Sequence, residues 1–317
     1  MANKLLVAPA PHVHGPESTQ RIMLDVIIAL LPALAVSVWV FGWDVLRVTA
    51  IAILSCVALE WFIQKYMFKG KPTVGNLSAV LTGLLLSFNL PASIDWWLVV
   101  IGAVVAIGIA KMSFGGLGKN PFNPALVGRV FLLIAYPVQM TTFPAPRAAA
   151  DAFSGATPLA TENLAEVDFS SMLFGGIPGS LGEVAALALL VGFVYLLWRK
   201  VISWHIPVAV LGTMALFAFL VALTRGGDAS LLWHFPLFHL LAGGAILGGV
   251  YMATDYATSP MSISGMLVYG VGIGLITMMI RLWGAYPEGM SFAILLMNAV
   301  TPLLNKYLVP KRFGFNK

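Results

Sequence analysis

Charged side chains are scarce in this sequence, because Asp, Glu, Lys and Arg together make up 10% of its 317 residues. A soluble domain usually carries about 25% charged residues, since its surface faces water. Hydrophobic residues instead account for 59% of the chain, and the mean hydropathy is +0.91. These values exclude a soluble globular fold and predict that most of the surface faces lipid.

Cysteine is almost absent, with Cys56 as the single thiol in the sequence. One thiol excludes an internal disulfide, and it cannot complete a structural zinc site or ligate an iron–sulfur cluster. The five histidines show no shared ligand spacing and are expected at the membrane interface. No metal site is therefore predicted, and any iron–sulfur centre that works with this chain must belong to another subunit.

Long apolar runs fill the chain and predict an all-α, polytopic membrane protein with a single integral membrane domain over residues 1–317. A helix needs about 20 apolar residues to cross the hydrocarbon core. The runs predict ten helices, near residues 22–40, 47–65, 74–91, 96–112, 122–138, 181–199, 203–224, 236–254, 262–282 and 288–306.

The positions of Lys and Arg predict the orientation of these helices. If residues 1–21 form a cytoplasmic arm, 14 of the 18 basic residues fall on the cytoplasmic side, as the positive-inside rule expects. Only Arg47, Arg147, Arg225 and Arg281 fall outside. Both termini are then cytoplasmic and the long loop 139–179 is exoplasmic, so the basic pI of about 9.4 reflects orientation and not nucleic-acid binding.

Residues 78–89 resemble residues 244–255 in their pattern of Gly, Ala and Leu. Five predicted helices separate the two segments, so they would run in opposite senses across the membrane. This pattern predicts two inverted five-helix repeats, an arrangement that many transport folds use to build a central site. The alternative is that these common residues recur by chance in membrane helices.

Asp25 lies four residues into the first predicted helix, and Glu60 and Asp255 lie towards the cytoplasmic ends of theirs. Acids at membrane depth are costly and are candidates for ion pathways. Asp255, with Thr254 and Thr258 beside it, and Asp25 are the residues we expect on such a pathway. A position at a solvated helix end is the alternative explanation for all three acids.

Two further groups of polar residues flank the predicted helices. Ser180 and Glu183 have the spacing of a capping box that opens helix 181–199, and the free amides of that helix end could also receive a phosphate. Asn120, Asn123 and Arg129 lie around two prolines at the start of helix 122–138. They are candidates for flavin binding or an ion pathway, and the alternative is a kinked helix satisfied by its neighbours.

Within the exoplasmic loop, Ser154, Gly155, Ala156 and Thr157 form a short stretch of small residues. By itself this is an ordinary Ser/Gly turn, and a threonine hydroxyl is a poor nucleophile without activation. The stretch resembles the flavinylation signature Ser/Thr-Gly-Ala-Thr, and Asp151 fits the same pattern. This resemblance implies that a flavin transferase attaches FMN to Thr157 through a phosphoester bond.

Other segments carry the same family resemblance. Residues 115–129, 135–139, 154–157 and 177–183 are similar, in this order, to the NqrB/RnfD family. That family comprises the B subunits of sodium-pumping NADH:quinone oxidoreductases and the D subunits of Rnf complexes. The short N-terminal arm resembles the D subunits.

The resemblance implies a subunit that is not catalytic alone, in a bacterial or archaeal cytoplasmic (inner) membrane complex. The complex passes electrons between ferredoxin and NAD and moves Na⁺ or H⁺. Its membrane, flavin and iron–sulfur subunits would be the partners of this chain, which would also contact membrane lipid but no nucleic acid. The resemblance implies a noncovalent riboflavin as well. The alternatives are the quinone-reductase subunit and a non-redox transporter or channel on an inverted-repeat scaffold.

Overall fold

A computed structural model describes residues 18–70, 72–144, 146, 159, 168–184, 186–226, 229–284, 286 and 288–309. Within these residues the protein is all-helical and has no β-strand, which confirms the predicted fold class. The helices of the first half are α1 (Thr19–Phe41), α2 (Trp43–Phe62) with η1 (Ile63–Met67), η2 (Val74–Asn76), α3 (Ser78–Phe88), α4 (Trp96–Ala103) with η3 (Val104–Lys111) and η4 (Met112–Phe114), α5 (Pro124–Ala135) and α6 (Pro137–Thr141). Those of the second half are α7 (Phe169–Phe174), α8 (Ala186–Trp198), α9 (His205–Thr224), α10 (Ala229–Leu241), η7 (Leu247–Met252), α11 (Ile263–Trp283) and α12 (Met290–Tyr307).

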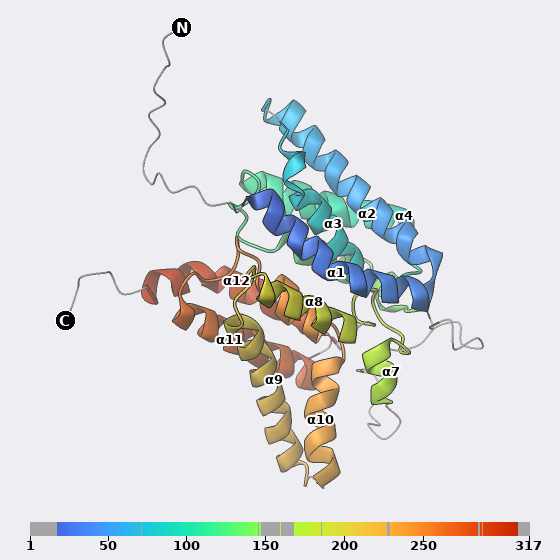
Figure 1. The fold of residues 1–317 in the computed structure, drawn as a ribbon, viewed down its shortest axis with the longest axis vertical. Helices are drawn as coiled ribbons and strands as arrows, with labels where there is room; N and C mark the ends of the chain where they lie inside the picture. The colour runs from blue at the N-terminus through green and yellow to red at the C-terminus, as the bar shows by residue number, and fades with distance from the viewer. Residues whose placement is uncertain are drawn as a thin grey trace, which may run out of the picture.

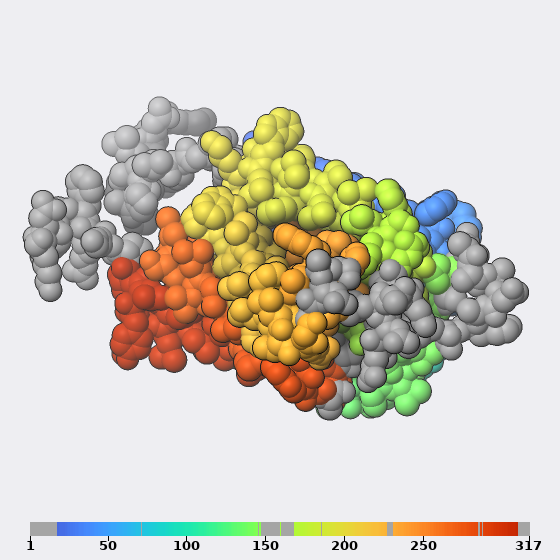
Figure 2. Space-filling model, turned by 90° about the horizontal axis from the view of Figure 1, so that it is seen from below, coloured from blue at the N-terminus to red at the C-terminus, as the bar shows by residue number. Residues whose placement is uncertain are grey.

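The helices form two groups that follow the order of the chain. In Figure 1, α1 to α4 lie together at the top, and α9 to α12 lie together below them. The groups are joined where α8 packs on α1 and where α12 packs on α5. Seen from below, α7 and α10 lie next to each other on the surface (Figure 2), and these two helices are in contact. Figure 1 also shows that α1 begins and α12 ends towards the left of the molecule, whereas α7 lies towards the right.

Five helices are long and apolar enough to cross a membrane by length and composition: residues 19–41, 43–67, 96–114, 205–224 and 263–283. No more than 56% of any of these spans is buried inside the protein. The outer faces carry exposed large side chains such as Leu54, Val194 and Leu216. Apolar surface of this extent requires lipid around it, so the chain is a multi-pass membrane protein.

The remaining apolar helices are shorter than the sequence predicts. Helix α3 has 11 residues, α5 has 12 and α8 has 13, whereas about 20 are needed for a crossing. The predicted helix 236–254 is broken into α10 and η7, because Gly243 and Gly244 both adopt φ 62°. Glycine reaches this left-handed conformation without the steric cost of a Cβ. The prediction of one continuous helix there is therefore wrong, and the scheme of ten helices in two inverted repeats stays a prediction.

The two segments that resemble each other in sequence become short elements in the centre of the molecule. Nearly every residue of α3 and all of η7 are buried. Their ends meet where Asn89 Nδ2 lies 3.7 Å from Met252 Sδ. Each element begins after left-handed backbone, at Leu77 (φ 63°) before α3 and at Gly243 and Gly244 before η7.

Candidate functional site

Arg129 on α5 is the middle of a cluster of buried polar side chains. Its Nη1 donates to Asn89 Oδ1 at 2.7 Å, and its Nη2 donates to Glu288 Oε2. The same Nη2 lies 3.7 Å from Glu183 Oε1. All four residues are at least nine-tenths buried, and a buried guanidinium needs such partners to offset its lost hydration. We call Asn89, Arg129, Glu183 and Glu288 the buried polar centre.

Asn123 positions the helix that carries Arg129. Its Oδ1 accepts hydrogen bonds from the amides of Ala125 (3.1 Å) and Leu126 (3.4 Å), so it is the N-cap of α5. Its Nδ2 donates to the carbonyl of Met252 at 3.2 Å, at the end of η7. Asn123 therefore fixes the start of α5 against the end of η7. Its neighbour Asn120 makes only a local bond, from Nδ2 to Phe122 O at 3.0 Å.

The segment 180–183 brings Glu183 into the centre. The amides of Leu181 and Gly182 donate to the carbonyls of Leu90 (3.1 Å) and Phe88 (2.8 Å). The bond from Gly182 satisfies the carbonyl of Phe88, which α3 leaves free at its C-terminal end, and the bond from Leu181 satisfies that of Leu90, two residues beyond the helix. A Cβ on Gly182 would lie 2.7 Å from Leu247 Cδ2 and 2.9 Å from Phe88 Cβ, so only glycine allows this close approach.

The predicted capping box at Ser180 and Glu183 is formed only in part. Glu183 Oε2 accepts from the amide of Ser180 at 3.3 Å, which is one half of such a box. The Ser180 hydroxyl is buried and has no partner, and α8 begins at Ala186. The prediction of a helix that starts at residue 181 is wrong, because the amides of Leu181 and Gly182 bond to the carbonyls of Leu90 and Phe88 and not within α8.

Arg281 holds the glycine turn that separates α10 from η7. Its Nη1 donates to the carbonyl of His239 at 2.6 Å, and its Nη2 donates to those of Ala242 and Gly243, both at 2.8 Å. A cation is well placed at the carbonyl end of a helix. A Cβ on Gly244 would lie 3.2 Å from Glu183 Oε1, so this turn borders the buried polar centre.

Buried polar atoms without a partner gather in this region. Of the ten such side-chain atoms among the described residues, eight belong to Arg129, Ser180, Glu183, His239, Arg281, Glu288 and Ser291. Buried polar groups in proteins are almost always hydrogen-bonded, so each exception requires an explanation. A ligand with several donors and acceptors would supply the missing partners.

Of the three acids that the sequence places in or near helix ends, Glu60 and Asp25 are buried, whereas Asp255 is half-buried. Glu60 is 1% exposed, and its Oε2 lies 2.6 Å from Lys111 Nζ, which also donates to Ser78 Oγ at 2.8 Å. The alternative of a solvated helix end is wrong for Glu60, because its partner arrives from η3. Asp25 accepts from Tyr195 Oη at 2.9 Å and pairs with Arg199 at 3.1 Å.

Asp255 follows η7, and its Oδ2 accepts from Thr258 Oγ1 at 3.2 Å. It lines a pocket of about 500 Å³ together with Thr19, Ile22, Met23, Leu117, Gly118, Tyr256, Ala257, Ser259, Met261 and Asn305. Asp25 and Asp255 make no hydrogen bond to each other or to Arg129. The structure therefore does not join them into one site.

Asp151, Ser154, Gly155, Ala156 and Thr157 lie outside the described residues. Leu159 is described, and its side chain packs against the apolar core. A Cβ on Gly243 would collide with Leu159 Cδ1 and would lie 3.0 Å from Arg281 Nη2. The chain two residues after Thr157 is therefore in contact with the glycine turn beside the buried polar centre.

Sequence reasoning identified Arg129, Glu183 and Asn123 but not Asn89, Glu288 or Arg281. Glu288 and Arg281 lie near the ends of predicted helices, where charges usually face water. His239, expected at the interface, is 5% exposed. The part of the chain that the structure describes holds no group of three or more His, Cys, Asp or Glu that could bind a metal. Cys56 has a free thiol and is buried in α2.

Asp168, outside the membrane spans, is the N-cap of α7. Its carboxylate accepts from the hydroxyls of Ser171 (2.6 Å) and Ser170 (2.8 Å) and from their amides. Hydrogen bonds from Ser171, and then from Ser170, hold the pKa of this exposed carboxyl below its usual value.

Comparison with known proteins identifies the family. The sequence model of the NQR2, RnfD, RnfE family matches residues 6–314. The chain is 47% identical over 319 residues to the D subunit of the Na⁺-translocating ferredoxin:NAD⁺ oxidoreductase complex of Acetobacterium woodii, covering 99% of this chain and 96% of that protein. It is 41% identical to the D subunit of the proton-translocating ferredoxin:NAD⁺ oxidoreductase complex of Clostridium ljungdahlii, with 98% and 97% covered. It is 36% identical to the D subunit of an ion-translocating oxidoreductase complex of Escherichia coli, with 98% and 99% covered. The chain therefore belongs to the NQR2, RnfD, RnfE family.

Proposed function

We propose that this chain is the D subunit of an Rnf-type complex and that it carries FMN covalently on Thr157. Its relatives are named as subunits of ferredoxin:NAD⁺ oxidoreductase complexes that translocate Na⁺ or protons. The chain would then be one part of a translocase, and the other subunits of the complex would be its partners. A flavin transferase would attach the FMN.

The contact between Leu159 and the glycine turn carries this proposal. It brings Leu159, two residues after Thr157 in the sequence, to the turn that Arg281 and Glu183 border. Two residues of extended chain span at most about 7 Å, so Thr157 is bound to stay near Leu159. The unpartnered atoms of Arg129, Glu183 and Glu288 add the donors and acceptors that a polar cofactor needs.

The residues present fit a flavin in their charge and chemistry. A bound flavin supplies electron transfer, and the protein supplies its binding, orientation and electrostatic environment. Arg129 and Arg281 place two positive charges in a buried region, and such charges favour an electron-rich ring. Glu183 and Glu288 limit this effect, because each lies beside Arg129.

A second flavin and the ion fit elsewhere in the fold. The pocket beside Asp255, at about 500 Å³, lies within the range of roughly 300–1,000 Å³ that cofactor sites occupy. We assign the noncovalent riboflavin to this pocket, and Na⁺ or H⁺ to a pathway that includes Asp255 and Asp25. We further propose that the termini are cytoplasmic and that residues 139–179 are exoplasmic, an orientation that the positions of Lys and Arg favour.

Flavin fluorescence on a denaturing gel tests the proposal. The wild-type chain, expressed with an active flavin transferase, should give a fluorescent band. Thr157→Ala should give a dark band of equal protein amount, whereas Thr161→Ala, a matched threonine in the same segment, should stay fluorescent. A dark wild-type band beside a known flavinylated protein labelled by the same transferase would overturn the proposal and favour a non-redox transporter.

The quinone-reductase subunit is the other candidate with a covalent flavin. Purification of the native complex separates the two, because an Rnf-type complex reduces NAD⁺ with reduced ferredoxin. A complex that oxidises NADH with a quinone and does not accept electrons from ferredoxin would favour the quinone-reductase assignment.

A further inference from the structure

A pocket of about 370 Å³ lies where two of the membrane-spanning segments, residues 43–67 and 96–114, come to an end. In Figure 1 this end of α2 lies at the top of the molecule. The pocket is distinct from the one beside Asp255, although Leu117 lines both. Its volume is within the range of roughly 300–1,000 Å³ that is usual for ligand sites, so a polar headgroup fits inside it.

The polar side chains that line this pocket are held so that they offer hydrogen-bond donors. Gln64 Oε1 accepts from the amide of Thr73 at 2.6 Å, and Gln64 Nε2 donates to Thr73 Oγ1 at 2.9 Å. The hydroxyl hydrogen of Thr73 therefore remains available. Asn76 Oδ1 accepts from the amide (2.9 Å) and the hydroxyl (2.8 Å) of Ser78. Asn76 Nδ2 donates to none of the described residues, so it is the second donor that a ligand can use.

Lysine supplies positive charge at this pocket. A Cβ placed on Gly115 would lie 3.0 Å from Lys119 Cδ and 3.6 Å from Lys119 Nζ, so the ammonium group lies over a lining residue. Gly115 adopts φ 102°, and the absence of a Cβ leaves room for this side chain. Lys69 lies between the lining residues Phe68 and Gly70. Both lysines are exposed, and neither belongs to an ion pair within the described part of the chain.

The carboxylate beside Gln64 does not cancel this charge. Glu60 accepts from Gln64 Nε2 at 3.2 Å, but it is 1% exposed and already pairs with Lys111 at 2.6 Å. Among the described residues, no Asp or Glu lines the pocket. Positive charge together with free donors favours an anionic group such as a phosphate, because charge-assisted hydrogen bonds are the strong ones.

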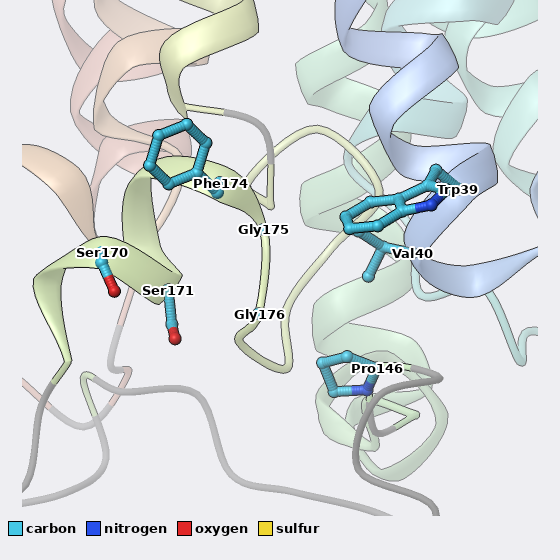
Figure 3. Close-up of a pocket in the computed structure, with 8 residues that line it drawn as sticks. All are labelled: Trp39, Val40, Pro146, Ser170, Ser171, Phe174, Gly175 and Gly176. Atoms are coloured by element: carbon cyan, nitrogen blue, oxygen red, sulfur yellow. The ribbon is translucent and has the colours of Figure 1, made fainter.

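The larger pocket of about 520 Å³ between the end of α1 and helix α7 differs in this respect. Figure 3 shows Trp39 and Phe174 on opposite sides of it. The hydroxyls of Ser170 and Ser171, which also line it, both donate to Asp168. No Lys or Arg is among its described lining residues. This pocket therefore does not suit a phosphate, and it provides a control site.

The surroundings of the basic pocket favour a lipid over a soluble anion. Trp61, Tyr66 and Phe114 are exposed around it, as in the aromatic belt at a membrane surface. Lys65 Nζ lies 4.5 Å from the centre of the Trp61 ring, as expected of a lysine that reaches from apolar surface towards the headgroups. Most of the span 43–67 is not buried inside the protein, so acyl chains cover its outer face directly below the pocket.

We propose that this pocket binds the phosphate of an anionic glycerophospholipid, of the phosphatidylglycerol or cardiolipin class. Lys119 and Lys69 neutralise the phosphate charge, and Thr73 and Asn76 donate hydrogen bonds to its oxygens. The acyl chains lie along the outer face of α2. Basic pockets between membrane helices on the cytoplasmic side bind such headgroups, and the proposed orientation gives this pocket to the cytoplasmic side.

A lipid titration of the purified full-length chain, followed by native mass spectrometry, tests the site. The wild type should bind phosphatidylglycerol more tightly than phosphatidylcholine. Lys119→Gln should weaken the binding of phosphatidylglycerol about tenfold, because one charge-assisted contact is lost. Lys306→Gln is the matched control and should bind like the wild type. Lys306 also lies over an aromatic ring at a helix end, 5.7 Å from the centre of the Tyr307 ring, but it does not line the pocket.

Asn76→Asp provides a second variant. It keeps the oxygen that accepts from Ser78, and so the start of α3, but it replaces the free donor with a negative charge. Phosphatidylglycerol binding should be lost, while the unfolding midpoint in phosphatidylcholine stays close to that of the wild type. Trp39→Leu, in the pocket of Figure 3, should leave the binding of phosphatidylglycerol unchanged.

Three results would overturn the proposal. The first is equal affinity for phosphatidylglycerol in the wild type, Lys119→Gln and Asn76→Asp. The second is binding of glycerol 3-phosphate as tight as that of phosphatidylglycerol, which would assign the pocket to a soluble phosphate compound. The third is loss of another subunit from the Lys119→Gln complex with an unchanged number of bound phosphatidylglycerol molecules, which would assign the pocket to a partner subunit.

Discussion

Lys111 and Glu60 meet as a buried ion pair, with Nζ 2.6 Å from Oε2, although 51 residues separate them in the sequence. Lys111 comes from η3 and Glu60 from the end of α2. Ser78 at the start of α3 accepts a further hydrogen bond from Lys111 at 2.8 Å. Three helices of the first half are therefore joined by one ammonium group.

Removal of one partner of this pair should destabilise the protein strongly. We expect Glu60→Gln and Lys111→Met each to cost about 3–5 kcal/mol, because the remaining charge is left buried. The double variant Glu60→Met with Lys111→Met should regain most of the loss. Thermal unfolding in detergent measures the stability of all three variants. A loss in the double variant equal to the sum of the two single losses would contradict the pairing.

Replacement of Arg129 by methionine or by lysine should lower the stability of the protein. Arg129→Met leaves Glu183 and Glu288 buried without a cation, which should cost about 3–5 kcal/mol. Arg129→Lys should recover only part of this, because a lysine cannot present the fork that reaches Asn89 and Glu288 together.

Arg47→Lys is the control for Arg129. Arg47 pairs with Asp44 at 3.4 Å on the surface, where such pairs contribute about 0–1 kcal/mol. The unfolding midpoint of Arg47→Lys should therefore stay close to that of the wild type. A similar loss in Arg129→Lys and Arg47→Lys would contradict the assignment of a buried polar centre.

Even an alanine side chain in the glycine turn, residues 243–244, should destabilise the protein. Gly243→Ala and Gly244→Ala each force a Cβ into left-handed backbone, at about 1–2 kcal/mol, and at Gly243 it also collides with Leu159. Gly212→Ala in α9 is the matched control, because nothing lies within 4 Å of its added Cβ. It should be neutral or stabilising by up to about 1 kcal/mol. Unfolding midpoints of the three variants give the comparison.

The cap of α7 should depend on pH. Asp168 has a pKa below its ordinary value because it accepts hydrogen bonds from Ser171 and Ser170. A lowered pKa means that the carboxylate stabilises the folded segment at neutral pH, and that this contribution fades as the pH falls below about 4. Hydrogen exchange of residues 169–174, corrected for the intrinsic rates, should show less protection in acid. Asp168→Asn should abolish this pH dependence.

The sequence predicted the long helices well because each one fills its own apolar run. The short elements were harder to predict, since α3 and η7 are as apolar as a crossing helix and only tertiary contacts show where they end. The left-handed backbone of Gly243 and Gly244 is stabilised by contacts with Arg281 and Leu159, which lie far away in the sequence.

The difference between local sequence patterns and tertiary contacts also explains which site residues could be predicted. Arg129, Asn123 and Glu183 were identified because they lie in segments with unusual local sequence. Glu288 was not identified, because it stands at the start of the predicted helix 288–306, where charges usually face water. Its partner Arg129 is 159 positions away, and no local pattern reports a pairing at that distance.

The short helix α3 determines the order in which the two halves of the protein can fold during synthesis. Its 11 residues extend about 16 Å, which is near half of the hydrocarbon thickness. The carbonyls of Phe88 at its end and of Leu90 just beyond it accept from the amides of Gly182 and Leu181. These amides emerge from the ribosome about 90 residues later than the helix itself, at roughly 5–20 residues per second. During those seconds the carbonyl at the end of α3 lacks its final hydrogen-bond partner. The first half of the protein therefore reaches its final form only after the second half has begun to enter the bilayer.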